Sequence, residues 1–164
     1  MLDLGDELVF RTNLCHKLLV DCAYQETQFT VDDASDFQTY KEALEALDLD
    51  EGYKAQLILN CVAAKRFHKP VQPKSWFFNH QGGADEQPKI GDIVQLSNDF
   101  NCGLFIVLEV GDNASLCAQV ELDEFHLTSN KSLGFSEAIK VMHDRMMPYQ
   151  VQQAYPFQQY AMVG

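Results

Sequence analysis

The residues Leu104-Phe-Ile-Val-Leu-Glu-Val110 are rich in β-forming side chains and lie between two runs in which apolar and polar residues alternate. The apolar members of these runs are Ile90, Val94 and Leu96 on one side and Leu116, Ala118, Val120 and Leu122 on the other. Turn-forming residues separate the three runs at 98–103 and 111–114. Short strands at this regular spacing are typical of small barrels. We therefore predict that residues 86–164 form a small twisted β-barrel domain.

The segment Pro88-Lys-Ile-Gly-Asp-Ile-Val94 also resembles the opening of SH3-like barrels. Farther along the chain the pattern is weaker. We predict a short helix over 136–147, and a final strand is the alternative. The uncharged residues 148–164 are rich in Gln and Tyr and fit either a frayed tail or an added strand.

Two helices are predicted before the strands. Apolar side chains recur at helical spacing along 32–47, and Thr30 with Asp33 matches the pattern of a capping box. A second helix is expected from Asp50 to about Phe67. Its apolar side chains cover nearly the whole circumference, so it should be largely buried.

A β-hairpin is predicted at the start of the chain, because Leu2 and Leu4 on one side of Gly5-Asp6, and Leu8 and Phe10 on the other, occupy every second position around a tight turn. The hairpin and the two helices together form an N-terminal α/β domain over residues 1–80. The residues 80–88 have the composition of a linker or exposed loop. The predicted fold class is therefore α+β, with the α/β domain followed by the small SH3-like barrel.

The chain carries a net charge of -12, which argues against a nucleic-acid groove because phosphate binding needs a basic surface. The first residues carry acids rather than the Lys or Arg of a secretory signal, and no apolar run reaches the ~20 residues of a membrane helix. The chain has five cysteines, which is an odd number, and no CxxC pair. We therefore expect a cytoplasmic protein with reduced thiols, bound to no membrane.

A basic segment interrupts this acidic sequence. Residues 61–80 contain Lys65, Arg66, Lys69 and Lys74 and no acid. One interpretation is a docking surface for an acidic partner. The other is that the first three bases stabilise the C-terminus of the second helix, where cations are favourable. That second interpretation does not account for Lys74, which lies beside Trp76.

The residues do not form a catalytic or metal-binding motif. The five histidines include no HExxH and no pair at helical ligand spacing, so we expect no metal. Neither a nucleophile elbow nor a phosphate-binding glycine loop is present. We predict a protein that is not an enzyme and needs no cofactor.

Seven segments in order resemble the ZapC family of cell division proteins. They are Met1-Leu-Asp-Leu4, Leu8-Val-Phe-Arg11, Val31-Asp-Asp-Ala34, Lys54-Ala-x-Leu-x-Leu-Asn60, Lys69-Pro-x-x-Pro-Lys-Ser-Trp76, Asn113-Ala-x-Leu-Cys117 and Ala138-Ile-Lys-x-Met-x-Asp-Arg145. Each segment is modest alone, but together they span nearly the whole chain. In the family a further segment rich in Trp and Tyr precedes the first of them.

The resemblance implies an accessory protein of the bacterial division ring that acts in the cytoplasm at the division site. Such proteins bind FtsZ, promote lateral association of its protofilaments and lower its GTPase activity. The family architecture is an α/β domain followed by a β-barrel-like domain. The chain is expected to be a monomer or to self-associate weakly. An SH3-like adaptor that recognises a peptide or a nucleic acid is the alternative function.

FtsZ is acidic, so the basic segment is the expected contact. We predict that Lys69 and Lys74, supported by Arg66 and anchored by Trp76, bind the partner. Leu2 lies in the first matched segment and should either line a hydrophobic pocket or pack into the core.

Overall fold

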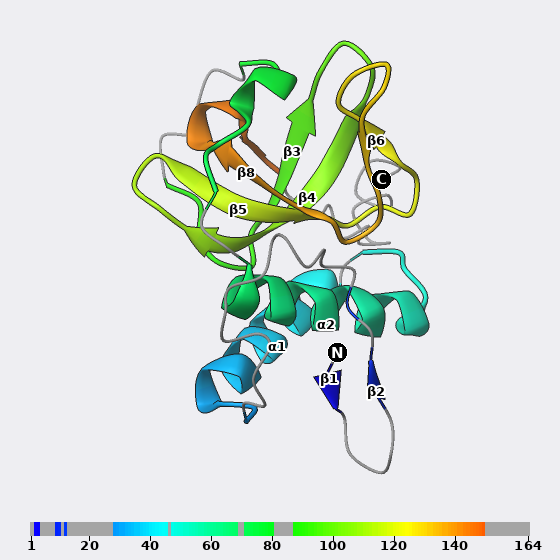
Figure 1. Ribbon diagram of the computed structural model, residues 1–164, viewed down its shortest axis with the longest axis vertical. Coiled ribbons are helices and arrows are strands. Elements are labelled where there is room, and N and C mark those ends of the chain that lie inside the picture. Colours follow the sequence, from blue (N-terminus) through cyan, green and yellow to red (C-terminus); the bar gives the residue numbers. More distant parts are fainter. Residues whose placement is uncertain are drawn as a thin grey trace, which may run out of the picture.

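In this computed structural model, the described residues are 2–3, 9–10, 12, 28–45, 47–68, 71–80 and 87–149. Figure 1 shows a strongly curved antiparallel sheet with two helices beneath one of its faces. The class predicted from the sequence, α+β, is confirmed.

Five strands form the sheet. They are β3 (Ile93–Ser97), β4 (Cys102–Val110), β5 (Ala114–Gln119), β8 (Ala138–Met142) and β9 (Met147–Pro148). Their order is β8-β5-β4-β3-β9, and every neighbouring pair is antiparallel. A separate two-stranded ladder joins β6 (Phe125–His126) to β7 (Ser132–Leu133). The two alternating runs of the sequence therefore predicted β3 and β5 correctly, and the β-rich run between them predicted β4.

The sheet curls strongly. The 3-10 helix η4 (His143–Arg145) connects β8 and β9, which lie at opposite edges of the sheet. A flat sheet of this width would hold its edges ~19 Å apart, whereas η4 rises only ~2 Å per residue, so the sheet must bend for so short a connection to suffice. A register shift between Val107 and Glu109 of β4 contributes to the bend. Among the described residues no ladder joins β8 to β9, so closure into an SH3-like barrel stays a prediction.

The helix predicted over 136–147 is wrong, because residues 138–142 form β8 and only 143–145 form a short 3-10 helix. Ile139 pairs with Cys117 of β5, and both Ile139 and Val141 are buried. An apolar residue at every second position satisfies one face of a strand, and the free edge of β5 supplies the ladder partner. The alternative for 148–164, an added strand, is confirmed at Pro148 alone, which pairs with Val94.

Helix α1 (Val31–Leu44) begins at the predicted capping box. The Thr30 N–H donates to Asp33 Oδ2 over 2.9 Å, and the Asp33 N–H donates to Thr30 Oγ1 over 3.1 Å. These reciprocal bonds satisfy two N–H groups that the helix start leaves without a partner. Helix α2 (Glu51–Phe67) follows Asp50, whose side chain makes no capping bond.

The hairpin at the start of the chain is confirmed. Strand β1 (Leu2–Asp3) pairs antiparallel with β2 (Val9–Phe10), and Leu2 lies opposite Phe10. The predicted turn at Gly5-Asp6 and the side chains of Leu4 and Leu8 lie outside the described residues.

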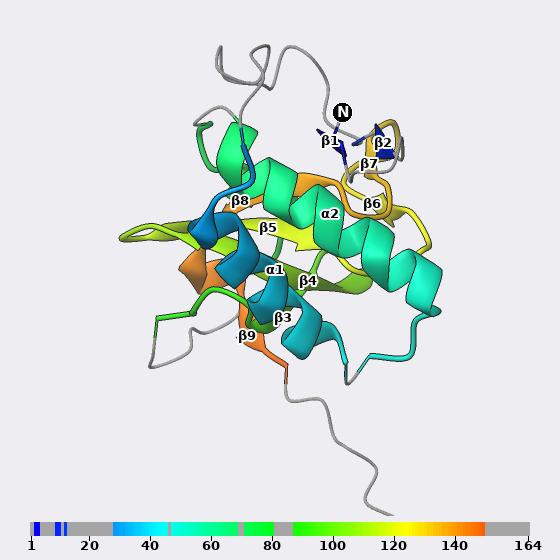
Figure 2. The ribbon, with the colours of Figure 1, turned by 90° about the horizontal axis from the view of Figure 1, so that it is seen from below.

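The two helices cover one face of the sheet, as the view from below in Figure 2 shows. Their buried side chains include Leu44 of α1 and Leu57 of α2, and these pack against Ile106 and Leu108 of β4. The Tyr40 hydroxyl donates to the Leu108 carbonyl over 3.1 Å. The helices and the sheet therefore share one hydrophobic core.

A close backbone approach adds to this contact. Gly91, in the turn before β3, has φ +92°, and a Cβ there would lie 2.8 Å from Thr39 Cγ2 of α1. Glycine is needed at this position both for the conformation and for the space.

A second core lies on the other face of the sheet. Side chains alternate along β4, so Phe105 and Val107 point away from the helices. Phe105 packs edge-on against Phe125 and Phe78, with ring centroids 5.4 and 6.3 Å apart. Phe78 follows the 3-10 helix η3 (Ser75–Phe77), which therefore lies on the face opposite the helices.

Candidate docking surface

The structure separates the bases of the predicted docking segment into two groups. Lys65 and Arg66, at the end of α2, pair with acids of α1. Lys65 Nζ lies 2.6 Å from Asp36 Oδ1, and Arg66 Nη1 lies 2.5 Å from Asp33 Oδ2. Both pairs hold the two helices together, and the charges of both cations are balanced within the protein.

Arg66 has further partners. Its Nη1 also donates to the Gln28 carbonyl over 2.8 Å, and its guanidinium lies 5.1 Å from the centroid of the Phe67 ring. Asp33 accepts from both Arg66 and the Thr30 N–H, so one carboxylate serves the helix cap and the ion pair. The guanidinium of Arg66 is thus engaged inside the helical layer.

Lys74 belongs to the other group. It precedes η3, its side chain is exposed, and it takes part in no ion pair with an acid in the described part of the chain. Lys69 lies outside the described residues.

Trp76 is presented on η3, and its side chain is 70% exposed. Its ring packs only at a tilt against the neighbouring Phe77, with centroids 5.4 Å apart. A large exposed indole on a short, well-anchored turn is costly in water and is the residue type enriched at binding hot spots. The structure therefore brings Lys74 and Trp76 together and presents both outward.

Backbone contacts with β8 hold η3 in place. The Lys74 N–H donates to the Lys140 carbonyl over 2.8 Å, and the Met142 N–H donates to Ser75 Oγ over 2.9 Å. Ser75 is 6% exposed, and Phe78 anchors the end of the segment in the second core. The turn is thus held by its backbone hydrogen bonds and by its buried residues, which lie close to the exposed Lys74 and Trp76 in the chain.

Leu2 lies elsewhere. It is half-buried on β1, and Figure 1 shows β1 and β2 beyond the helices, on the side away from η3. The structure does not bring Leu2 together with Lys74 and Trp76.

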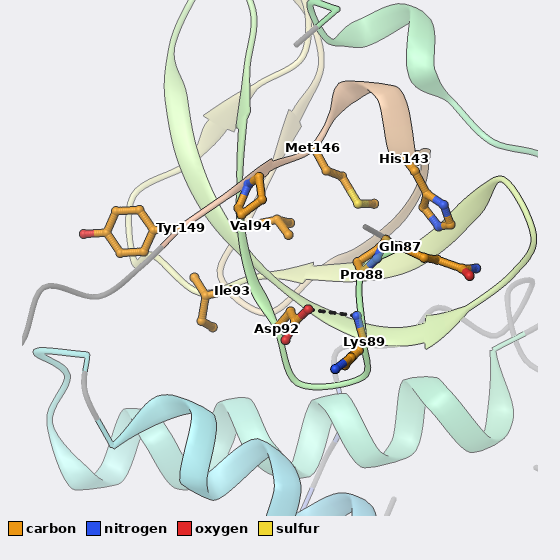
Figure 3. A pocket seen from close by; sticks show the side chains of 10 residues that line it. Gln87, Pro88, Lys89, Asp92, Ile93, Val94, His143, Met146 and Tyr149 are labelled. Atoms are coloured by element: carbon orange, nitrogen blue, oxygen red, sulfur yellow. Dashed lines mark hydrogen bonds between the residues drawn. The ribbon is translucent and has the colours of Figure 1, made fainter. Parts of the chain in front are cut away.

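A cavity of about 290 Å³ opens between β3, β9 and η4 (Figure 3). Its lining is Gln87, Pro88, Lys89, Asp92, Ile93, Val94, His143, Met146, Pro148 and Tyr149. The Lys89 N–H donates to Asp92 Oδ2 over 2.8 Å, as the dashed line in Figure 3 shows. This carboxylate is therefore already used to hold the turn before β3.

The polar group of chemical interest in this cavity is His143. Its Nε2 lies 2.8 Å from Ser115 Oγ, and burial lowers the pKa of the imidazole. A hydroxyl beside an imidazole is the arrangement of an activated nucleophile. Ser115, however, is 0% exposed and cannot meet a substrate, so the pair fastens η4 to β5.

The described cysteines are unpaired. Cys61 and Cys117 are buried, and burial raises the pKa of both thiols far above the ordinary value, so neither forms a reactive thiolate. Among the described residues, no three His, Cys, Asp or Glu side chains gather so that they could hold a metal ion. In the same part of the chain, no helix is both long enough and apolar enough to span a membrane.

An exposed cation and indole on a rigid turn are typical of a protein-binding surface. Comparison with known proteins shows the family of the chain. The model of the N-terminal region of the cell-division protein ZapC matches residues 1–69, and the model of its C-terminal region matches residues 70–152. The chain therefore belongs to the ZapC family of cell-division proteins.

Individual proteins of this family are similar to the chain over most of its length. The chain is similar to the cell division protein ZapC of Vibrio vulnificus (strain CMCP6), at 66% identity over 146 residues that cover 89% of this chain and 81% of the relative. The Vibrio cholerae protein of the same name is 60% identical with the same coverage. The Aliivibrio salmonicida protein is 48% identical over 164 residues, which cover 100% of this chain and 89% of the relative.

Proposed function

We propose that this protein is a non-enzymatic accessory of bacterial cell division that acts in the cytoplasm at the division site. It binds FtsZ directly, promotes lateral association of FtsZ protofilaments and lowers their GTPase activity. Membership of the ZapC family supports the role in cell division. The observation that carries the contact is the exposed pair Lys74 and Trp76 on the anchored turn η3.

Charge distribution supports this choice of contact. The exposed acids Asp32, Glu42 and Glu45 lie on or next to α1, beneath the opposite face of the sheet. An acidic partner such as FtsZ would be repelled from that side and attracted to the side of Lys74. Lys69, five residues before Lys74 in the chain, adds to the same charge in the sequence.

Bundling requires two contacts for each crosslinking unit, because a protein with one contact only decorates a filament. Leu2 on β1 lies on the side away from η3, so we propose that it marks a second, apolar contact. Once one contact has formed on a polymer, the second gains from a high effective concentration, so each can be weak. A monomer with two contacts is then sufficient. Lateral contacts that favour the polymer slow subunit exchange, which lowers GTPase activity without a catalytic group from this chain.

Co-sedimentation with FtsZ and GTP tests the proposal. We expect Lys74→Glu to weaken binding about tenfold at low salt, because it reverses the exposed charge at the contact. Lys41→Glu is the matched control, because it makes the same exchange at an exposed lysine of α1, on the opposite side. We expect it to bind like the wild type.

The two-contact proposal has its own readout in the same assay. Leu2→Ala should still bind filaments through η3 but should no longer bundle them, as seen by electron microscopy of the pellets. If the wild-type protein itself neither pellets with FtsZ nor bundles it at low salt, the proposed function is wrong. If Lys74→Glu binds like Lys41→Glu, the placement of the contact is wrong.

A further inference from the structure

A second exposed aromatic side chain, Phe100, lies on the turn between β3 and β4. The side chain is 57% exposed, and it belongs to neither hydrophobic core. The fold therefore gains little from this ring. Burying an aromatic side chain contributes a large apolar area, so this solvent-facing ring offers apolar area that a partner would bury.

The turn that carries Phe100 is rigid. Asn98 Oδ1 accepts from the Phe100 N–H and from the Asn101 N–H, each over 2.9 Å. The Asn98 N–H donates to the Asn101 carbonyl over 2.9 Å and closes the turn. An asparagine that bonds to the backbone two and three residues ahead fixes a turn in one conformation. Phe100 is thus held in place before any partner arrives.

The same asparagine ties this turn to η3. Asn98 Nδ2 donates to the Phe77 carbonyl over 3.1 Å, next to Trp76 in the chain. The Asn79 N–H donates to the Ser97 carbonyl over 2.7 Å. The turn and the end of η3 are therefore joined by two hydrogen bonds directly after Trp76.

A third segment is bonded to the same turn. Asn98 Nδ2 also donates to the His126 carbonyl over 2.8 Å, and the His126 N–H donates to Asn101 Oδ1 over 2.8 Å. Strand β6, which holds Phe125 in the second core, thereby braces the turn against the sheet. The two exposed rings, Trp76 and Phe100, stand on neighbouring segments of one rigid frame.

We propose that Phe100, Trp76 and Lys74 form one docking surface for a partner segment that carries a carboxylate next to apolar side chains. This inference rests on the proposed function, since the partner is the filament that Lys74 and Trp76 contact. Two rigid aromatic anchors lose little conformational entropy on binding and supply most of the apolar contact.

Charge also sets the direction in which that segment lies. Lys74 offers a cation at the η3 end of the surface, while Asp99 is exposed beside Phe100 at the other end. A carboxylate of the partner is attracted to Lys74 and repelled by Asp99, so its apolar side chains meet Phe100.

Binding of full-length variants to FtsZ filaments tests this inference. We expect Phe100→Ala to raise the Kd about tenfold, as the loss of an aromatic anchor does. The control is Phe29→Ala, because Phe29 is also an exposed phenylalanine, at 62%, but precedes α1 on the helical side. It should bind like the wild type. Phe100→Trp keeps a ring at the same place and should retain binding.

Salt dependence separates the two kinds of contact. Between about 50 and about 300 mM salt, the loss caused by Lys74→Glu should shrink, because charge–charge attraction is screened. The loss caused by Phe100→Ala should persist, because it is apolar. Since the ring is exposed, the melting temperature of Phe100→Ala should match that of the wild type.

The outcomes distinguish this inference from the proposed function. A wild-type protein that binds no FtsZ overturns the proposed function. If the wild type binds FtsZ and Phe100→Ala binds equally well, only the role of Phe100 is overturned. A loss in Phe100→Ala that disappears at high salt, or that Phe29→Ala shares, also overturns it.

Discussion

The two faces of the sheet use the same kinds of residue in opposite ways. On the helical face, Lys65 and Arg66 are paired with acids of α1. On the other face, Lys74 and Trp76 stand outward on η3. All four residues come from one short stretch of sequence. Bases that are close in the chain can therefore have different environments. One pairs with an acid inside the fold and another is exposed to solvent, depending on the face of the sheet on which each lies.

The faces also differ in how they are covered. Two full helices shield one face, and Leu57 of α2 is completely buried there. The other face is covered by short segments such as η3 and β6, which meet around Phe105 and Phe125. The short segments on this face leave Lys74 and Trp76 exposed between their anchored residues. The thinner cover is where we place the docking surface.

The largest expected effect concerns whether the two faces fold together. Leu57→Ala should lower the free energy of unfolding by about 2–5 kcal/mol, because it opens a cavity in the core that α2 shares with the sheet. Urea unfolding followed by far-UV circular dichroism reports the helices, and fluorescence of Trp76, the single tryptophan, reports the opposite face.

We expect these two probes to give one coincident transition in the wild type and in Leu57→Ala, because β4 contributes side chains to both cores. Two separate transitions would instead show that the helices and the opposite face of the sheet unfold independently.

The next effect compares the two kinds of base. Arg66→Ala should lower the free energy of unfolding by about 1–3 kcal/mol, because it removes a charged hydrogen bond from the nearly buried Asp33. Lys74→Ala should change it by less than about 0.5 kcal/mol, as is usual for an exposed side chain. Equal losses in urea unfolding would contradict the division between a structural and a docking base. In FtsZ co-sedimentation the order should reverse, with Lys74→Ala the weaker binder.

The smallest effect is a pH dependence at η4. Burial lowers the pKa of His143 below its ordinary value of 6.5, so the unfolded chain binds the proton more tightly than the folded one. Stability from the neutral imidazole is therefore present above that ordinary value and is lost as the pH falls through and below it. His143→Gln removes the titrating group.

Urea unfolding at about pH 7.5 and about pH 5 should show the wild type losing more stability than His143→Gln on acidification. If both proteins lose the same free energy of unfolding, a group other than His143 is responsible for the pH dependence. A larger loss in His143→Gln would reverse the sign of the effect and contradict burial as its cause.

Elements set by neighbouring residues were predicted well. The capping box of Thr30 and Asp33 involves positions three apart, and both of its hydrogen bonds are present. The β-rich run 104–110 predicts a strand, and the structure confirms it as β4. Residues 138–142 form a strand where a helix is predicted, because a short apolar run suits either and only the edge of β5 decides between them.

The sequence by itself determined the α+β class, the start of α1, the strands β3 to β5 and the resemblance to the ZapC family. The class and these elements depend on local hydrogen bonds and on side-chain periodicity among neighbouring positions, whereas the resemblance rests on the residues of seven matched segments. Only the tertiary structure decided which of the described bases in residues 61–80 pair with acids of the protein. Arg66 meets Asp33, 33 residues away, and Asn98 meets Phe77, 21 residues away. Such contacts form when layers pack, because segments far apart in the chain then approach within hydrogen-bonding distance. No local sequence pattern predicts them.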